Sequence, residues 1–163
     1  MRIVTIDPGT SNTGLVYMDE RRILCARTLH FNGAVGNDQD ALRERAGKIA
    51  RMIADWIADK PHECVVMEGF VGFSGRQGGY TYQTPYLCGY LHKALEGEEI
   101  AIQTSRQVLN PRTRGNLAHL KDGMAMGKEV YPGCGFCTND HLRSAAVHGI
   151  YYLKRKGIWK PER

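Results

Sequence analysis

The sequence predicts an α/β protein with a mixed five-stranded sheet and helices on both faces of that sheet. The first part of the chain holds three short apolar segments separated by turn residues, which is typical of an antiparallel meander. Helix-like and strand-like segments then alternate, which is typical of parallel strands joined by helices. The 163 residues suffice for one hydrophobic core, so we expect a single domain over residues 1–163.

The meander is expected to begin with a strand at residues 3–6, which are apolar on both faces, as in a central buried strand. Two further strands are predicted at residues 14–18 and 23–29. The charged segment 19–22 lies between them and predicts a turn, so the three strands are expected to follow one another in antiparallel order.

A long helix is expected next. It begins at Asn37 or Asp38 and ends before Pro61, and apolar residues recur along it every three to four positions, which predicts one buried face. A buried strand is predicted at residues 64–67, with Glu68 at its end. An acidic residue directly after an apolar strand is costly unless it is exposed or paired, so Glu68 is a candidate functional residue.

The remaining elements are a loop, a helix, a short strand, a weakly periodic helical stretch and a final helix. They are expected at residues 69–84, 85–96, 99–103 and 105–128, and from Thr138 or Asn139 to about Arg155. The loop is rich in glycine and aromatic residues and is too long for a simple connection. Pro85 suits the first turn of its helix because proline has no backbone N–H to donate.

The net charge favours a polyanionic partner. Lys and Arg number 22 against 17 Asp and Glu, which gives a net charge of +5. A positive field attracts phosphate backbones, although a merely basic surface is the alternative interpretation. No apolar run approaches the roughly 20 residues of a membrane span. The chain starts directly with a strand-like run, so we expect no signal peptide and a cytoplasmic location.

The sequence contains five cysteines, an odd number that suits a reduced compartment better than a set of disulfides. Cys134 and Cys137 have the spacing of half a zinc site, but no second pair of this kind occurs in the sequence. Whether these two cysteines bind zinc stays open at this stage.

Four acidic or imidazole side chains are expected to converge. Asp7 ends the first predicted strand, Glu68 ends the fourth, and Asp140 and His141 lie in the first turn of the last helix. If the first and fourth strands are neighbours, Asp7 and Glu68 lie side by side, because sites in open sheets of this class form at such strand ends. Oxygen and imidazole ligands of this kind suit Mg²⁺ or Mn²⁺, and two such ions about 4 Å apart can hydrolyse a phosphodiester.

Each of these residues also has an ordinary structural interpretation. Asp7, Pro8 and Gly9 are common turn residues, and Asp140 would complement a helix dipole. The loop after Asp7 is also typical of the phosphate loops of actin-like and sugar kinases. Those proteins need two such domains and much longer chains, and the sequence has no second phosphate loop. The four residues in this order therefore favour a metal site.

Four segments then carry a family resemblance. IDPGTSNTGLVYMD, VVMEGF, IAIQTSRQVL and NDHLRSAAVHGIYYL occur in this order over nearly the whole chain. With their spacing, they resemble the RuvC-type Holliday-junction resolvases of the RNase H-like superfamily, the divergent phage-type members above all. The resemblance implies an RNase H-like fold and a metal-dependent endonuclease that acts as a homodimer on four-way DNA junctions.

The resemblance also assigns roles to residues. It makes Asp7 and Glu68 the first two carboxylate ligands, with His141 as the third. It places Ser144 where the family has an aspartate, and a serine hydroxyl is a poor ligand by comparison. Asp140, four residues before Ser144, is expected to supply the missing charge as a direct or water-mediated ligand.

Aromatic and basic residues extend this expectation to DNA. Those in the loop after Glu68 would wedge or stack at a junction centre, and those after residue 104 would bind phosphates. The residues concerned are Phe70, Phe73, Arg76, Tyr80, Arg106, Arg112 and Arg114. Lys121 would help to stabilise charge in the transition state. Packing of the loop and ordinary solvated cations are the alternatives.

Two other functions remain open. A related single-domain RNase H-like nuclease would act on RNA instead of junctions. A junction-binding protein without catalysis is the other alternative, and Ser144 is the residue that motivates it.

Overall fold

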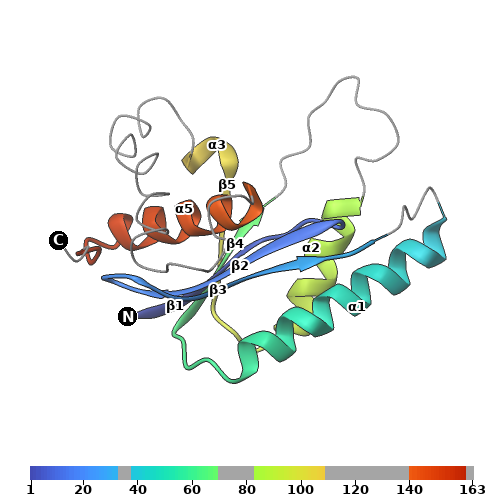
Figure 1. Ribbon diagram of the computed structural model, residues 1–163, viewed down its shortest axis with the longest axis horizontal. Helices are drawn as coiled ribbons and strands as arrows, with labels where there is room; N and C mark the ends of the chain where they lie inside the picture. Colours follow the sequence, from blue (N-terminus) through green and yellow to red (C-terminus); the bar gives the residue numbers. More distant parts are fainter. Residues whose placement is uncertain (33–37, 70–82, 109–139, 161–163) are drawn as a thin grey trace.

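A mixed five-stranded sheet forms the centre of the molecule (Figure 1). The computed structural model describes residues 1–32, 38–69, 83–108 and 140–160. Its strands are β1 (Arg2–Asp7), β2 (Asn12–Asp19), β3 (Ile23–His30), β4 (Cys64–Gly69) and β5 (Ile100–Thr104). They lie in the order β3-β2-β1-β4-β5. β1 pairs antiparallel with β2 and β2 with β3, whereas β1, β4 and β5 run parallel. The predicted meander followed by parallel strands is confirmed.

Helices cover both faces of this sheet, as predicted. The helices are α1 (Gln39–Ala58), α2 (Gln83–Ala94), α3 (Ser105–Val108) and α5 (Asp140–Arg155). α1 and α2 lie on one face and α5 lies on the other (Figure 1). None of the helices in the described ranges is long and apolar enough to cross a membrane.

The predicted helix boundaries are largely correct. Asp38 caps α1, since its carboxylate accepts hydrogen bonds from the backbone N–H groups of Asp40 (2.9 Å) and Ala41 (3.3 Å). α2 begins at Gln83, two residues earlier than expected. Pro85 still lies in the first turn, where its missing N–H removes no helical hydrogen bond. The predicted start of the last helix and most of the helical stretch 105–128 lie outside the described residues.

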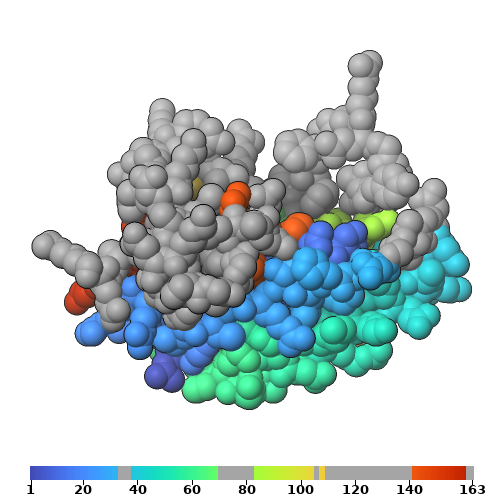
Figure 2. All heavy atoms as spheres, viewed as in Figure 1, coloured from blue at the N-terminus to red at the C-terminus, as the bar shows by residue number. Residues whose placement is uncertain are grey.

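The alternation of side chains along the strands creates two hydrophobic cores. On β1, Val4 and Ile6 face α1 and α2, whereas Ile3 packs against α5. The other strands alternate in the same way, and all members of these two sets are buried. In the space-filling view, the N-terminal strands and α1 form one continuous side of the molecule (Figure 2). The central strands β1, β2 and β4 are thus buried on both faces over most of their length.

Glycines allow α5 to lie unusually close to the sheet. A Cβ atom on Gly14 of β2 would collide with the backbone carbonyl of His141 and would lie 2.7 Å from the nitrogen of Leu142. Further along the helix, a Cβ atom on Gly149 would collide with the sulfur of Met18 and would lie 2.6 Å from Cγ2 of Thr5. Two close approaches therefore fix the depth at which α5 docks on β1 and β2.

Candidate active site

The parallel pairing of β1 with β4 brings Asp7 beside Glu68. Ile6 stands opposite Met67 in this ladder, and the next residues along are Asp7 and Glu68. Ile6 and Met67 face α1 and α2, so the period of two directs the next side chains to the α5 face. The two carboxylates interact electrostatically, and Glu68 raises the pKa of Asp7.

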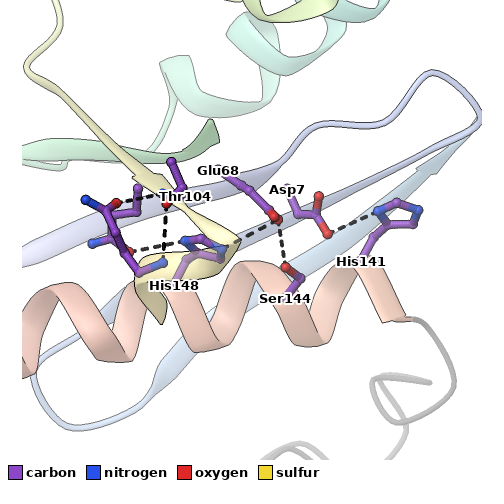
Figure 3. Close-up of polar contacts among 8 residues, drawn as sticks. Asp7, Glu68, Thr104, His141, Ser144 and His148 are labelled. Carbon is purple, nitrogen blue, oxygen red and sulfur yellow. Dashed lines mark hydrogen bonds and ion pairs between the residues drawn. The ribbon is translucent and has the colours of Figure 1, made fainter. Parts of the chain in front are cut away.

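His141 of α5 contacts Asp7 directly. Its Nδ1 atom lies 3.1 Å from Oδ2 of Asp7 (Figure 3). The Asp7 side chain is 12% exposed and that of His141 is 37% exposed, so the pair opens to solvent on the histidine side. Burial raises the pKa of Asp7, and Glu68 adds to this rise, while His141 opposes it. Asp7 is thus a buried carboxyl group whose charged form needs a cationic partner.

Ser144 contacts Glu68, one turn of helix after His141. Its hydroxyl donates a hydrogen bond of 2.9 Å to Oε2 of Glu68. The same oxygen lies 3.5 Å from Nε2 of His148 (Figure 3). The other ring nitrogen of His148 lies 3.2 Å from Oε1 of Gln103. Glu68 and Gln103 stand opposite each other in the β4–β5 ladder, so four polar side chains form one connected network.

The loop after β1 passes beneath His141. A Cβ atom on Gly9 would collide with the backbone carbonyl of Asn12 and would lie 3.1 Å from Cε1 of His141, so a larger residue would displace the turn. The hydroxyl of Thr13 donates to the carbonyl of Gly9 at 2.8 Å and accepts from its N–H at 3.3 Å, which holds the turn. Thr10 donates a 3.0 Å hydrogen bond to Gln83 and ties the loop to α2. The Pro-Gly turn is therefore part of the site.

The donor set fits a hard divalent cation. Asp7 and Glu68 offer carboxylate oxygens, the ligands that Mg²⁺ and Mn²⁺ prefer, and His141 adds an imidazole. Burial and, to a lesser extent, Glu68 raise the pKa of Asp7, and a bound cation would stabilise its charged form. Among the residues that the structure describes, no group of three or more His, Cys, Asp and Glu side chains has the arrangement of a ready-made metal site. Asp140 is the first residue of α5, and its side chain is not among those described.

Other predicted residues lie outside the described part of the chain. The residues concerned are Phe70, Phe73, Arg76, Tyr80, Arg112, Arg114, Lys121, Cys134 and Cys137. Arg106 belongs to α3, but its side chain is likewise not described. The DNA-binding and zinc expectations for these residues stay predictions.

The sequence prediction omits two members of the network, Gln103 and His148. His148 follows His141 by seven positions and Ser144 by four, so helical periodicity places all three on one face of α5. Gln103 occupies a strand position that faces the same side as Glu68. These periodicities were the sequence signal that could have pointed to Gln103 and His148. They identify a contact partner only when the strand order and the helix position are known.

Two comparisons of the sequence with known proteins found no match. No family model matches the chain, and the search of curated proteins found no significant match. The comparison of folds is therefore the informative one.

Solved structures of Holliday junction resolvases share this fold. A structure of Thermus thermophilus RuvC in complex with a Holliday junction substrate matches with a TM-score of 0.71 and 20% identity, over 99% of this chain and 99% of that chain. The yeast mitochondrial resolvase Ydc2 matches with a TM-score of 0.67 and 12% identity, over 97% of this chain and 80% of its own. The fowlpox virus resolvase matches with a TM-score of 0.57 and 10% identity, over 95% and 99%.

These matches cover nearly the whole chain, and they confirm the predicted resemblance at the level of the fold. The mixed five-stranded sheet in the order β3-β2-β1-β4-β5 and its helices match the fold of RuvC. The chain has the RNase H-like fold of RuvC and other Holliday junction resolvases.

Proposed function

We propose that this protein is a divalent-metal-dependent endonuclease that resolves four-way or other branched DNA junctions, acting as a homodimer. The observation that carries the proposal is the meeting of Asp7 and Glu68 at the ends of two parallel strands, beneath His141 and Ser144 of α5. An RNase H-like fold shared with resolvases over nearly the whole chain supports this choice of reaction class.

Asp7 and Glu68 would hold the metal, with His141 and Asp140 completing the set of ligands. Two bound Mg²⁺ or Mn²⁺ ions would supply a nucleophilic water and stabilise the leaving 3′ oxygen of the phosphodiester. The protein's own part is to orient these ligands. His141 contacts the Asp7 carboxylate, and Ser144 donates to the Glu68 carboxylate, so both carboxylates are restrained before any ligand binds. Lys121 would offset negative charge that develops during cleavage.

Branched DNA is the substrate class that the comparisons support. Thermus thermophilus RuvC and the fowlpox virus resolvase were both solved with Holliday junction DNA. The net charge of +5 agrees with a polyanionic ligand. We assign phosphate contacts to Arg106, Arg112 and Arg114, and junction-centre contacts to the loop residues Phe70, Phe73, Arg76 and Tyr80.

Cleavage of a labelled synthetic four-way junction tests the proposal. The wild-type protein is expected to cut the junction with Mg²⁺ or Mn²⁺ and to spare a linear duplex of the same sequence. Asp7→Asn and Glu68→Gln remove the charge of one ligand each while they keep its shape. Both variants are expected to bind the junction with cleavage reduced by at least about 10²-fold, which is the order of loss when a positioned catalytic group is removed.

The other outcomes separate the rival functions. Equal cutting by the wild type and the two variants would contradict the assignment of the site. Preferential cutting of RNA would identify an RNA-directed nuclease instead. Tight junction binding by the wild type, without cleavage in the presence of Mg²⁺ or Mn²⁺, would indicate a binding protein. The Ser144→Asp variant should then be tested for cleavage.

A further inference from the structure

His148 is a buried polar residue beside the candidate active site. Among the residues that the structure describes, its side chain is the largest fully buried polar one, with 1% of the residue exposed to solvent. Burying an imidazole is costly unless its ring nitrogens are paired, and an apolar side chain would fill the same space at lower cost. Packing alone therefore does not explain a histidine at this position.

Both ring nitrogens of His148 have partners. Nδ1 lies 3.2 Å from Gln103 Oε1, and Nε2 lies 3.5 Å from Glu68 Oε2. Gln103 is itself buried and stands directly opposite Glu68 in the β4–β5 ladder. The ring thus bridges two residues that are neighbours across the sheet (Figure 3). Because Ser144 donates to the same Oε2 atom, two groups of α5 contact one carboxylate oxygen.

We infer that His148 is a positioning residue, which donates its Nε2–H to Glu68 and, oriented by Gln103, holds the Glu68 carboxylate in place for metal binding. This inference rests on the proposed function, because it assumes that Glu68 binds a metal ion. It concerns residues that do not themselves bind the metal. Partners of this kind orient metal ligands and set their basicity in many metal sites.

The chemistry of the three side chains agrees with this role. Nε2 of His148 faces an oxygen of the Glu68 carboxylate, which can only accept, so a proton on Nε2 makes this contact favourable. The amide of Gln103 has both a donor and an acceptor, so rotation of this amide lets it pair with Nδ1 in either tautomer. Gln103 can therefore orient the ring while Nε2 carries the proton toward Glu68.

Metal affinity is the first test, because it does not depend on catalysis. We expect His148→Leu to weaken Mn²⁺ binding to the full-length protein about 10- to 100-fold by calorimetry, the usual effect of losing such a partner. His148→Gln places an amide N–H near the position of Nε2 and should restore affinity to within a few fold of the wild type. Tyr152→Phe, one turn further along α5 and also buried, is the matched control and should leave affinity unchanged.

A double-mutant cycle tests whether Gln103 acts through His148. Gln103→Met keeps a similar size but loses the amide, and it should weaken Mn²⁺ binding in the wild-type background. In the His148→Leu background, the same change should have no further effect, because the ring that it orients is gone. Equal losses in the two backgrounds would contradict the inference. This comparison also holds if His148→Leu lowers stability.

The protonation of the ring is a readout in the metal-free protein. Nitrogen-15 NMR should find Nε2 of His148 protonated, and an unprotonated Nε2 facing Glu68 would overturn the inference. Equal Mn²⁺ affinities for His148→Leu and the wild type would also overturn the inference. This holds even if the wild type cuts junctions. A wild type that binds Mn²⁺ with the predicted dependence on His148 but cuts no junction would contradict only the proposed function.

Discussion

Under the proposed function, Asp7 combines two requirements that conflict in the absence of a metal ion. Its carboxylate must be charged to bind a cation, yet it is buried and lies next to a second carboxylate. The contact with His141 offsets part of this cost, but the pKa of Asp7 stays above its ordinary value. Residues at binding sites commonly lower the stability of the fold that holds them. Asp7 should therefore destabilise the protein whenever it is charged and no metal is bound.

This argument predicts the pH dependence of stability in the presence of a chelator. The folded state holds the Asp7 proton more tightly than the unfolded state, whose pKa is close to 3.8. The stability that this group contributes is fully present below 3.8 and is lost as the pH rises through the raised folded pKa. Asp7→Asn cannot titrate, so it should be more stable than the wild type at pH 7, and the difference should shrink toward acidic pH. Urea unfolding at several pH values measures both effects.

The control for this prediction is Asp55→Asn on the exposed side of α1, which removes the same charge without burial. It should change stability little across the same range of pH. An Asp7→Asn variant that is less stable than the wild type at pH 7 would mean that the contact with His141 outweighs the cost of burial.

At the scale of elements, the docking of α5 decides the geometry of the site. One helix supplies His141 to Asp7, and both Ser144 and His148 to Glu68, so all three contacts depend on how deep the helix lies. Gly14 of β2 lies directly against the backbone at His141. The close approach involves backbone atoms, which cannot move aside as the end of a flexible side chain can.

Gly14→Ala should therefore push α5 away from the sheet at the site. We expect a loss of about 1–3 kcal/mol in the free energy of unfolding, the usual cost of overpacking a well-packed core. A displacement of about 1 Å at a catalytic centre can lower activity on the order of 10²-fold, so junction cleavage should fall as well. Urea unfolding and the junction assay measure the two effects.

Gly89→Ala in α2 is the matched control. A Cβ atom at this position would meet no heavy atom within 4 Å. Alanine favours a helix over glycine by about 1 kcal/mol, so this variant should be slightly more stable and should cleave junctions as the wild type does. Normal cleavage and normal stability in Gly14→Ala would contradict the proposed docking of α5.

At the scale of the whole molecule, the acidic site at the strand ends contrasts with the positive net charge. The parallel strands end at one edge of the sheet, where Asp7 and Glu68 meet, and the molecule as a whole carries a charge of +5. The acidic site is therefore a local feature of a positively charged protein. A DNA backbone would be attracted over a long range by the net charge and would approach the carboxylates only with a cation between them.

Junction binding should accordingly weaken as salt rises. Each neutralised phosphate of duplex DNA contributes a slope of about −0.9 to the plot of log affinity against log salt concentration. We expect a clearly negative slope for the cleavage-deficient Glu68→Gln variant, measured by fluorescence anisotropy between about 50 and 200 mM salt. Competition with linear duplex at each salt concentration separates preference for the branch from general attraction to DNA. An affinity that does not change with salt would contradict an electrostatic contribution from phosphate contacts.

The sequence by itself determined the order of the elements and the residues at the strand ends. Period-two patterns define the strands and period-3.6 patterns define the helices, and both depend on neighbours along the chain. They were sufficient to predict the mixed sheet. The proximity of Asp7 and Glu68 also required the first and fourth strands to be neighbours, which the structure shows.

Only the tertiary structure decided which side chains meet. His141 reaches Asp7 across 134 positions of sequence, and Ser144 reaches Glu68 across 76 positions. The link through His148 to Gln103 depends on the register of β4 with β5 and on the depth at which α5 docks. Strand register and helix docking are set by packing between distant segments, and the hydrophobic effect that drives this packing is not directional. Local patterns therefore located the candidate site residues along the chain, and the packing of α5 on the sheet selected their contacts.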